Sequence, residues 1–337
     1  MSAIGTLGRV RRFLEMEGNE LVHYSEPYLE FLRGCLPGAS IKVLEHRTDG
    51  EVDGILPVAI LRHSEYGTAI NSLPFFGSHG GPFAAGSSAG IRHALLRDLI
   101  DLAEELDAAT STLIEDPFHP LNDGEIAISR HMVIDDRIGQ FTVLPAGGDV
   151  EAALFDTFHM KTRNAVRKGL KLSLAVERQE DEAAWLWMQG VHEKSITSMG
   201  GIYKSMEVFD TLRRSFGDQA SLHLGSVAGQ PVCGLVSIRY RNTVEYFTPV
   251  IEEKWKESQA LSALIFLRMT EAARQGCTLW NWGGTWRNQE GVYRFKNRWG
   301  AFDRPYRYFN WVRKPEILTI PSLTVQQAFP YFYLFKY

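Results

Sequence analysis

The sequence predicts an α/β (α+β) fold made of two tandem domains, each with a mixed, mostly antiparallel sheet flanked by helices. Two observations lead to this prediction. The chain has 337 residues, the usual length of two domains of ordinary size. A β-β-loop-α-β pattern also occurs twice, with copies roughly 175 residues apart, which is far longer than the period of a stacked repeat.

The first copy opens with a polar glycine turn and a β-rich run at 50–60, as a hairpin does. A second β-type stretch covers 68–76, and a glycine-rich loop covers 77–90. A helix follows, because its apolar residues recur on one helical face, and a strand at 111–115 closes the unit. The residues of that face are Ile91, Ala94, Leu95, Leu99, Leu102 and Leu106.

The second copy repeats this order, with the turn and first strand at 229–239 and the next strand at 243–251. A loop at 252–259 leads into a helix, Gly276 ends it as a C-cap would, and a strand at 278–282 closes the unit. Its inward apolar residues are Leu261, Leu264, Ile265, Met269 and Ala272. We interpret the pair as an internal duplication; the alternative is a chance match of common folding patterns.

The domain boundary is predicted at the turn-rich stretch 145–149, where Asp149 is suited to cap the next helix. This divides the chain into an N-terminal domain at 1–148, a C-terminal domain at 149–315 and an aromatic tail at 316–337. We expect the tail to pack on its own protein, and the alternative is contact with a membrane surface or a partner.

Bulk properties exclude several classes of function. The net charge of −4 gives no global reason to expect DNA or an acidic membrane as partner. Cys35, Cys233 and Cys277 lie far apart in apolar segments, which predicts buried free thiols in a reducing cytoplasm. No stretch approaches the ~20 apolar residues of a transmembrane helix, and no secretory signal begins the chain. The prediction is a soluble cytoplasmic protein, with peripheral contact at the inner face of the membrane left open.

A basic segment at 158–171 is the first candidate binding site. It carries five basic residues and no acidic one. On a helix, residues four apart share a face, so like charges there repel one another and an anion would relieve the repulsion. Phosphate suits such a face, because Arg binds it as a fork and Lys as a point charge. The alternative is a solvated basic helix. The candidate residues are Lys161, Arg163, Arg167 and Lys168.

A strand that ends in Gly-Gly, followed by an aromatic and basic segment, is the candidate catalytic site. A lysine among aromatic residues loses much of its hydration and presents a strong positive charge to a developing oxyanion. The alternative is a basic surface loop whose aromatic residues pack inward. The catalytic candidates are Lys296 and Phe295, with Trp282, Gly283, Gly284, Tyr293 and Arg294 as binding residues.

Weaker candidates lie in two loops. The loop before the long helix of the second copy has no glycine to cradle a pyrophosphate, but Ser258 can cap the helix near Lys254 and Lys256. The glycine-rich loop of the first copy contains His79, a candidate proton carrier whose alternative is a structural role. Ser72 and Ser78 lack the G-x-S-x-G setting of an esterase nucleophile. No metal-binding spacing was found, so no metal is predicted.

Two of these segments resemble a known family. Residues 161–168, Lys-Thr-Arg-Asn-Ala-Val-Arg-Lys, resemble the basic helix that opens the second GNAT-like domain of Fem-type (FemAB-like) aminoacyltransferases. Residues 281–284, Asn-Trp-Gly-Gly, together with 291–296, Gly-Val-Tyr-Arg-Phe-Lys, resemble the closing segment of that family. The duplicated halves match its two GNAT-like domains. The similarity is strongest over 155–313.

The resemblance implies an N-acyltransferase with acyl-CoA or aminoacyl-tRNA as co-substrate and no tightly bound cofactor. The acceptor would be an amine of a cell-envelope precursor, a peptidoglycan peptide or a nucleotide-linked amino sugar for polysaccharide biosynthesis. By analogy, Lys296 stabilises the charge at the attacked carbonyl and Phe295 packs against the donor. The helical arm with which many Fem proteins engage tRNA is absent, and Lys204 is a candidate for their basic position. The alternative is a non-catalytic protein that binds a nucleotide-sugar or polysaccharide precursor.

Overall fold

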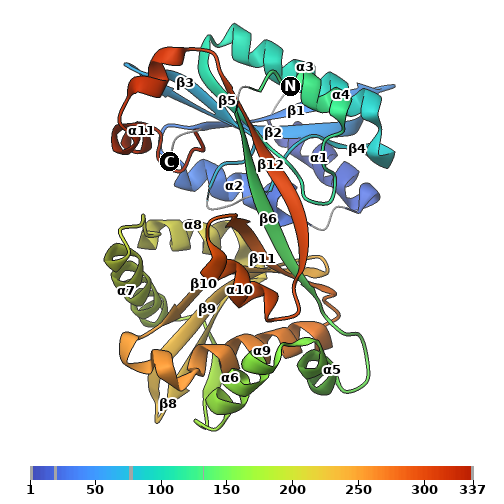
Figure 1. Ribbon diagram of the computed structural model, residues 1–337. Coiled ribbons are helices and arrows are strands. Elements are labelled where there is room, and N and C mark those ends of the chain that lie inside the picture. Colours follow the sequence, from blue (N-terminus) through green and yellow to red (C-terminus); the bar gives the residue numbers. More distant parts are fainter. Residues whose placement is uncertain (1–2, 19–20, 76–78, 132, 335–337) are drawn as a thin grey trace. The chain divides into compact units, whose positions relative to one another are not determined.

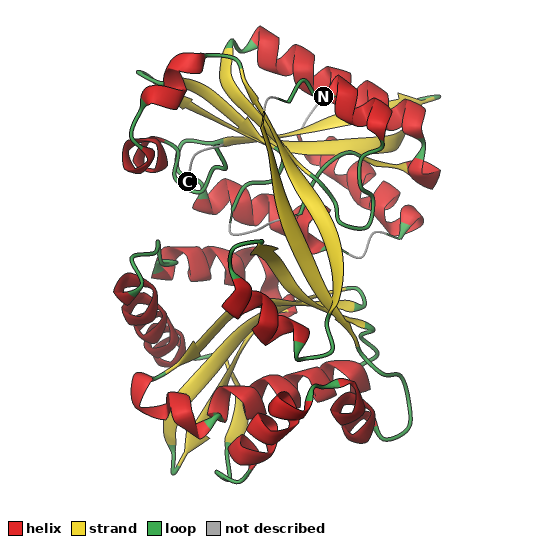
Figure 2. Cartoon of the chain, viewed as in Figure 1, coloured by secondary structure: helices red, strands yellow, loops and turns green. Residues whose placement is uncertain are grey.

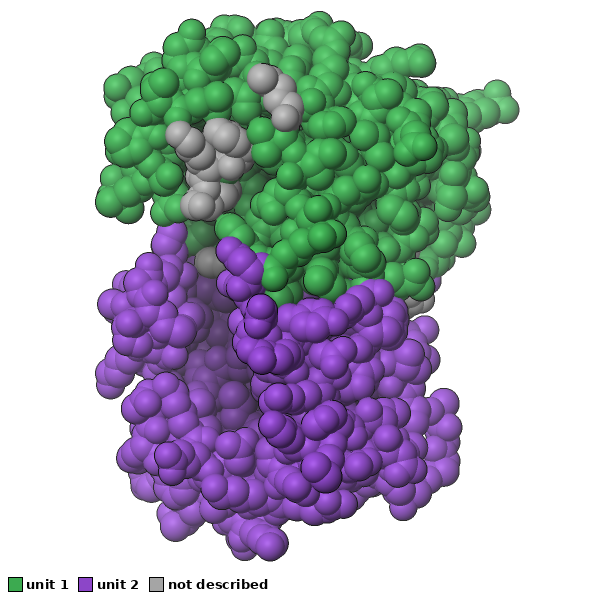
Figure 3. Space-filling view, in the orientation of Figure 1, with its two compact units in different colours: residues 1–139, 284–287, 304–337 green, residues 140–283, 288–303 purple. Residues whose placement is uncertain are grey.

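The computed structural model describes residues 3–18, 21–75, 79–131 and 133–334, and they form two compact units. Unit 1 comprises residues 1–139, 284–287 and 304–337, and unit 2 comprises 140–283 and 288–303 (Figure 3). Each unit is a sheet covered by helices on both faces (Figures 1 and 2). Residues 76–78 of the predicted glycine-rich loop, and the last residues of the tail, 335–337, lie outside the described residues.

Unit 1 has the sheet order β1-β2-β3-β5-β12. Its pairings are antiparallel except that of β3 with β5, which is parallel. Helix α3 packs on β1, β2 and β5, while α1 contacts β2 and α2 contacts β1 (Figure 1). The elements are α1 (Ala3–Glu17), α2 (Glu26–Cys35), β1 (Ser40–Thr48), β2 (Glu51–His63), β3 (Gly67–Asn71), β4 (Phe83–Ala84), α3 (Ala89–Glu105), β5 (Ala108–Ile114), α4 (Asp123–Ile128), α11 (Ser322–Ala328), and the 3₁₀ helices η1 (Val22–Tyr24), η2 (Ala85–Ser87) and η5 (Pro315–Thr319).

Unit 2 has the sheet order β11-β10-β9-β8-β7. Here β10 and β11 are parallel, and the other pairs are antiparallel. The elements are α5 (Val150–Thr157), α6 (Met160–Leu170), β7 (Ala175–Gln179), α7 (Glu182–Ser198), α8 (Met206–Phe216), η3 (Gly217–Gln219), β8 (Ala220–Val227), β9 (Gln230–Tyr240), β10 (Thr243–Ile251), η4 (Glu253–Ser258), α9 (Ala260–Arg274) and α10 (Glu290–Asn297). Strands β6 (Val133–Val143), β11 (Leu279–Trp286) and β12 (Phe302–Val312) contribute residues to both units.

The two units repeat one arrangement, as the duplicated pattern predicted. In unit 1 an antiparallel pair, β2 and β3, is joined through α3 to the parallel strand β5. In unit 2 the pair β9 and β10 is joined through α9 to the parallel strand β11. A parallel neighbour requires a crossover connection, and a helix on one face of the sheet supplies it in each copy.

The apolar helical faces expected from the sequence form the cores. Leu95, Leu99 and Leu102 of α3 pack in the core of unit 1. Leu264 and Met269 of α9 are fully buried in the core of unit 2. Full burial of one such side chain contributes about 1.5–3 kcal/mol, so these faces fix each helix on its sheet. Cys35, Cys233 and Cys277 are buried free thiols.

The course of the chain differs from the expected domain division. The sequence suggested a boundary after residue 148, whereas the compact units divide at 139, and residues 304–337 join unit 1. The reason is long-range strand pairing, because β12 lies antiparallel to β5 with Tyr308 opposite Ile114. The strand expected at 68–76 also ends sooner, at Asn71.

The aromatic tail packs on its own protein, as expected. The side chains of Phe329, Phe332 and Leu334 are buried. Among the described residues, no helix is both long and apolar enough to span a bilayer.

Candidate functional site

In unit 2, the parallel strands β10 and β11 part from one another. Their pairing joins Thr243 to Leu279 and ends where Glu245 faces Asn281. Beyond that point β10 continues along β9 with a bulge between Tyr246 and Thr248. A bulge bends the strand that carries it and locally increases its twist, so it turns β10 away from its former neighbour.

Glu245 and Asn281 are the two polar side chains at this parting. Side chains alternate across a strand, so they lie on the face opposite the core formed by Val244, Trp280 and α9. Both are buried, the Asn281 amide lies beside the Glu245 carboxyl, and Glu245 Oε1 has no hydrogen-bond partner among the described residues. Burial, offset in part by the neighbouring Asn281 amide, raises the pKa of Glu245 to about 8.

Lys296 reaches the same strand end from α10. Its Nζ donates a hydrogen bond to the carbonyl oxygen of Gly283 at 3.2 Å, and its residue is 7% exposed. Burial lowers the pKa of Lys296 to about 7, because an ammonium ion removed from water is costly. The expected desolvation of this lysine is therefore observed.

Gly283 connects these groups. Its N–H donates to Asn281 Oδ1 at 2.8 Å, while its carbonyl accepts from Lys296. Its φ of +73° lies in the left-handed region that favours glycine. A side chain placed on Gly283 would meet no atom within 4 Å, so the space beside this backbone is open. A reacting group can approach the strand end there.

Aromatic rings pack on the core side of β11, next to α10. The ring of Trp282 lies 4.9 Å from that of Tyr246 and 5.6 Å from that of Trp299. Phe295 packs edge-on against Trp282 at 5.9 Å. Phe295 remains 38% exposed, unlike Trp282, so part of its ring is available to a ligand. In the space-filling view, unit 2 is hollowed between α7 and α10 (Figure 3).

A second buried lysine lies on this side of the sheet. Lys204 Nζ is 5.1 Å from the ring centre of Phe247, the residue at the bulge of β10. Its backbone N–H donates to His192 Nε2 at 3.1 Å. Burial lowers the pKa of Lys204 to about 8, and burial together with the Lys204 charge lowers that of His192 to about 4. The Lys204 side chain contacts the bulge that separates the strands.

The basic helix predicted from the sequence is α6, and its basic side chains differ in their exposure to solvent. Lys161, Arg167 and Lys168 are exposed, whereas Arg163 is half-buried. Arg163 donates to the carbonyl oxygen of Phe155 at 3.4 Å, and the Arg167 guanidinium lies 5.3 Å from the Phe155 ring centre. These contacts are to neutral groups, so they leave the positive charge of the face uncompensated.

Helix α6 meets the start of α9 at Gly169. A Cβ on Gly169 would lie 2.3 Å from the carbonyl oxygen of Gln259 and 2.8 Å from Ala263 Cβ, so only glycine permits this approach. The N-cap residue of α9 is Gln259, not Ser258 as the sequence suggested, and its side chain makes no capping hydrogen bond. Ser258, one residue earlier, accepts from Ala260 N at 3.2 Å and donates to Trp255 O at 2.6 Å. The close contact places the basic helix beside the first turn of α9.

The loop before α9 forms the 3₁₀ helix η4 and gives no glycine cradle. Lys254 pairs with Glu252 at 3.0 Å, and Lys256 pairs with Glu253. The charges of both lysines are thus balanced within the loop. The positive surface available to a phosphate is that of α6.

Three other predicted residues are engaged in contacts of their own. Tyr293 donates to Asp303 Oδ2 at 2.8 Å, which raises the pKa of Tyr293. Arg294 is exposed and pairs with Glu290 at 3.5 Å. Gly284 belongs to unit 1, where an added Cβ would lie 2.0 Å from the Tyr306 hydroxyl oxygen.

His79, expected in a shaped loop, is completely buried in unit 1. Its ring lies 5.2 Å from that of His23 and 4.8 Å from that of Tyr306. These contacts fit the structural role that was the alternative for His79, and a part in proton transfer stays a prediction.

Glu245 and Asn281 were missed in the sequence. The available signal was weak: Glu245 is a single carboxylate in a β-rich run, and Asn281 stands between two tryptophans. A charged residue that is neither at a turn nor on an exposed strand requires a partner or a function. Only the register of β10 against β11 shows that the two lie opposite one another.

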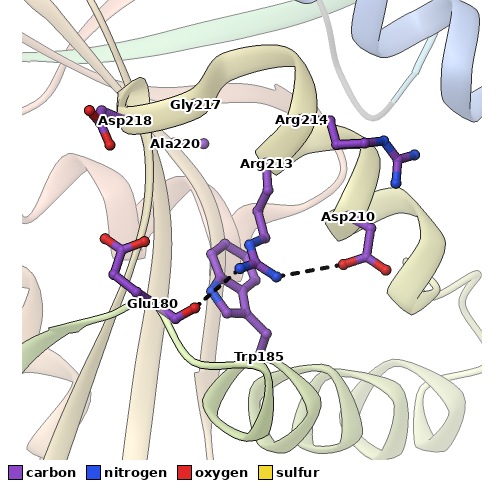
Figure 4. Close-up of a pocket in the computed structure, with 8 residues that line it drawn as sticks. All are labelled: Glu180, Trp185, Asp210, Arg213, Arg214, Gly217, Asp218 and Ala220. Carbon is purple, nitrogen blue, oxygen red and sulfur yellow. Dashed lines mark hydrogen bonds and ion pairs between the residues drawn. The ribbon is translucent and has the colours of Figure 1, made fainter.

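A pocket of about 370 Å³ lies elsewhere in unit 2, between the ends of α7 and α8 (Figure 4). At its centre Arg213 donates to the carbonyl oxygen of Glu180 at 3.1 Å and lies 3.7 Å from Asp210. The guanidinium is 5.1 Å from the ring centre of Trp185. Its charge is already engaged by the protein, so we assign this pocket no ligand. Within the described residues, no cluster of side chains suited to a metal ion occurs.

Comparison with known proteins agrees with this geometry. Residues 158–297 match the family model of the acetyltransferase (GNAT) domain. The fold is similar to that of FemX (TM-score 0.72, 13% identity, covering 93% of this chain and 97% of FemX). It is also similar to a tandem GNAT protein from the clavulanic acid biosynthesis pathway (TM-score 0.55, 13% identity, 92% and 95% covered).

A further similar structure is the C-terminal domain assigned to a lysylphosphatidylglycerol synthetase of Agrobacterium fabrum (TM-score 0.58, 11% identity, 96% and 97% covered). No curated protein sequence matches the chain. At these identities the structural likeness shows the fold.

The matched domain and the fold together define a GNAT-type acyltransferase. Within that class, the chain shares its fold with FemX, the kind of protein that the resemblance in the sequence implied.

Proposed function

We propose that unit 2 transfers an acyl or aminoacyl group from an activated, phosphate-bearing carrier to an amine of a cell-envelope precursor. One observation carries this proposal above the others. The buried Lys296 ammonium lies at Gly283, beside open space on β11 just after β10 has parted from that strand. A positive charge held in a site of low polarity stabilises an oxyanion more strongly than the same charge in water does.

The residues at the parting of the strands divide the chemistry between them. Glu245 takes a proton from the acceptor ammonium, and its raised pKa suits a general base that works near neutral pH. The free amine then attacks the acyl carbon, and Lys296 faces the oxygen on which negative charge develops. Collapse of that intermediate breaks the bond to the carrier. Asn281 and Gly283 link the two catalytic candidates through the strand.

The basic face of α6 supports a phosphate-bearing carrier. Arg167 and Lys168 lie on the helix that touches the start of α9 through Gly169. Phosphate groups bound there would orient the carrier relative to α10, which lowers the entropic cost of the reaction. Both acyl-CoA and aminoacyl-tRNA carry such groups. We propose that Phe295, whose ring is partly exposed, packs against the acyl end of either donor.

The structural neighbours support an aminoacyl cargo and an acceptor of the envelope. FemX and a domain assigned to a lysylphosphatidylglycerol synthetase share this fold. We propose that the enzyme works in the cytoplasm, at the inner face of the membrane where such precursors are available.

The test is a transfer assay with matched donors. Purified protein is incubated with radiolabelled acetyl-CoA or with tRNA charged with radiolabelled amino acids, and with UDP-linked muropeptides or amino sugars as acceptors. We expect label to enter the acceptor with one donor class, and a Lys296→Met variant to lose that transfer. Absence of transfer from both donor classes, in protein of native circular dichroism, would refute the proposed substrates. Equal transfer by the variant would refute the role of Lys296.

A further inference from the structure

Unit 1 has its own parting of parallel strands. The pairing of β3 with β5 ends where Asn71 faces Thr112, and β3 stops there while β5 continues to Ile114. By topology, this pair occupies the place that Glu245 and Asn281 occupy in unit 2. The two copies can therefore be compared position by position.

In unit 1 the chain itself fills the parting. The Asn71 side chain donates to the carbonyl oxygen of Tyr333 at 2.9 Å and accepts from the N–H of Tyr333 at 2.5 Å. Thr112 Oγ1 donates to the same carbonyl oxygen at 2.7 Å. One amide side chain thus pairs with both backbone groups of one residue, as a neighbouring strand would. At the matching place in unit 2, Glu245 Oε1 lacks such a partner among the described residues.

Aromatic contacts give this docking a preference for particular side chains. The ring of Tyr333 lies 4.7 Å from that of Tyr308, and the ring of Tyr331 lies 5.0 Å from that of Phe75. The N–H of Phe75 donates to the carbonyl oxygen of Tyr331 at 3.1 Å. Backbone pairing supplies affinity for any peptide, whereas ring contacts at residues two apart select aromatic ones.

Backbone strain is concentrated at this contact. Leu73, Phe75 and Tyr331 have φ values of 55°, 96° and 67°, in the left-handed region that bulky residues avoid. Leu73 and Phe75 follow β3 in the site, and Tyr331 lies in the docked segment itself. Strain of this kind persists only where the surrounding contacts enforce it, and it clusters at ligand clamps and switches. The bound segment is held against an opposing strain, which favours its release.

We propose that the parting of β3 and β5 in unit 1 is a binding site for an aromatic peptide segment, with residues 329–334 as its resident ligand. The four residues that define the site are Asn71, Thr112, Phe75 and Tyr308. The inference is independent of the reaction assigned to unit 2, because all the residues that carry it belong to unit 1.

The first test restores the segment in trans. A chain that ends at Ala328 is titrated with a synthetic peptide of residues 326–334, and binding is measured by calorimetry. We expect saturable binding of one peptide per chain. Asn71→Ala in the shortened chain should weaken it about 10-fold or more, because the N–H of Tyr333 loses its partner and the carbonyl oxygen of Tyr333 keeps only Thr112. A peptide of the same composition in reversed order is the control. Absence of binding by a folded, shortened chain, or equal binding of the control, overturns the proposal.

A second test covers the case in which the shortened chain does not fold. In the full chain, hydrogen exchange of the amides in 329–334 is compared between the wild type, Asn71→Ala and the matched control Ser129→Ala. We expect exchange in this segment to rise about 10-fold in Asn71→Ala alone, with α3 and β2 unchanged. Unchanged exchange of the segment overturns the proposal, and so does a rise spread evenly over unit 1.

Discussion

Replacing Lys296 by methionine separates catalysis from stability in this enzyme. Methionine is similar in length and unbranched, so it fills the space of the lysine stem without its charge. Lys296 is 7% exposed, and its Nζ donates to the carbonyl oxygen of Gly283 on the strand. The substitution should abolish most of the activity while making the protein more stable.

The magnitude of the stability change follows from the pKa. Burial lowers the pKa of Lys296 from 10.5 to about 7. A group whose folded pKa is lowered binds fewer protons when folded than when unfolded, so stability rises as pH increases from 7 to 10.5. At pH 7 nearly all of the penalty remains, and each pH unit corresponds to 1.36 kcal/mol, which gives a cost on the order of 4 kcal/mol. Methionine removes this cost and loses one hydrogen bond, a loss of about 1 kcal/mol.

The loss of activity follows from the oxyanion. Removal of one donor to an oxyanion lowers kcat about 10²–10³-fold, or about 2.7–4 kcal/mol. We therefore expect kcat to fall by that factor while the KM of the donor stays within about twofold, since the interaction forms only in the transition state. Arg294→Met, which removes an exposed charge from the same helix, is the matched control.

The assay combines transfer kinetics with urea unfolding at pH 7 and pH 9. Lower activity together with lower stability would show that Lys296 serves the fold, and the reasoning would then be wrong. Unchanged kcat in a more stable variant would remove the catalytic role alone. A stability gain that is larger at pH 7 than at pH 9 would confirm the buried charge as its source.

Four further outcomes are expected. Glu245→Gln should lower kcat about 10²–10⁴-fold without loss of stability, because the amide replaces a carboxyl that is mostly protonated at pH 7. Turnover within twofold of the wild type would exclude Glu245 as the general base. The profile of kcat/KM against pH should be bell-shaped with its maximum at about pH 7.5. Activity rises with pH as Glu245 ionises, with a pKa of about 8, and falls as Lys296 loses its proton, with a pKa of about 7. An acidic limb that survives in Glu245→Gln would contradict this origin. Arg167→Ala should raise the KM for the donor about tenfold with kcat unchanged, whereas Lys254→Ala should have no effect because the Lys254 charge is paired. Equal effects of the two substitutions would refute a phosphate site on α6. Gly169→Ala should lower the melting temperature by about 2–12 °C, because its Cβ would collide with the backbone of α9, and a melting temperature within 1 °C would show that the helices can separate freely.

Local patterns in the sequence were sufficient for the repeated part of the fold, whereas α1, α7 and β12 among other elements were not predicted. Apolar residues that recur with a period of 3.6 predicted the buried faces of α3 and α9, and turn chemistry predicted the hairpins of both copies. The same signals revealed the duplication, because each copy repeats the same order of short-range patterns. Lys296 could be singled out for a similar reason, since its aromatic neighbours in sequence already implied desolvation.

Long-range pairing decided the rest. Residues 304–337 join unit 1 because β12 pairs with β5, a choice made by residues almost 200 positions apart. Asn71 and Tyr333 are 262 positions apart, and Glu245 meets Asn281 only through the register of two parallel strands. Periodicity specifies which face of an element is buried, but it carries no information about which strand becomes its neighbour. His79 shows the same limit, because a glycine-rich loop gave no sign of the rings that enclose it.

The sequence by itself determined the repeated unit with its element types and the lysine whose charge is central to the proposed chemistry. The tertiary structure decided that a buried carboxyl stands at the parting of strands in unit 2, and that the chain's own tail fills the matching place in unit 1. The physical reason is that hydrogen bonds and burial between distant segments form only when the sheet is assembled, whereas helix and strand patterns depend on neighbours a few residues away.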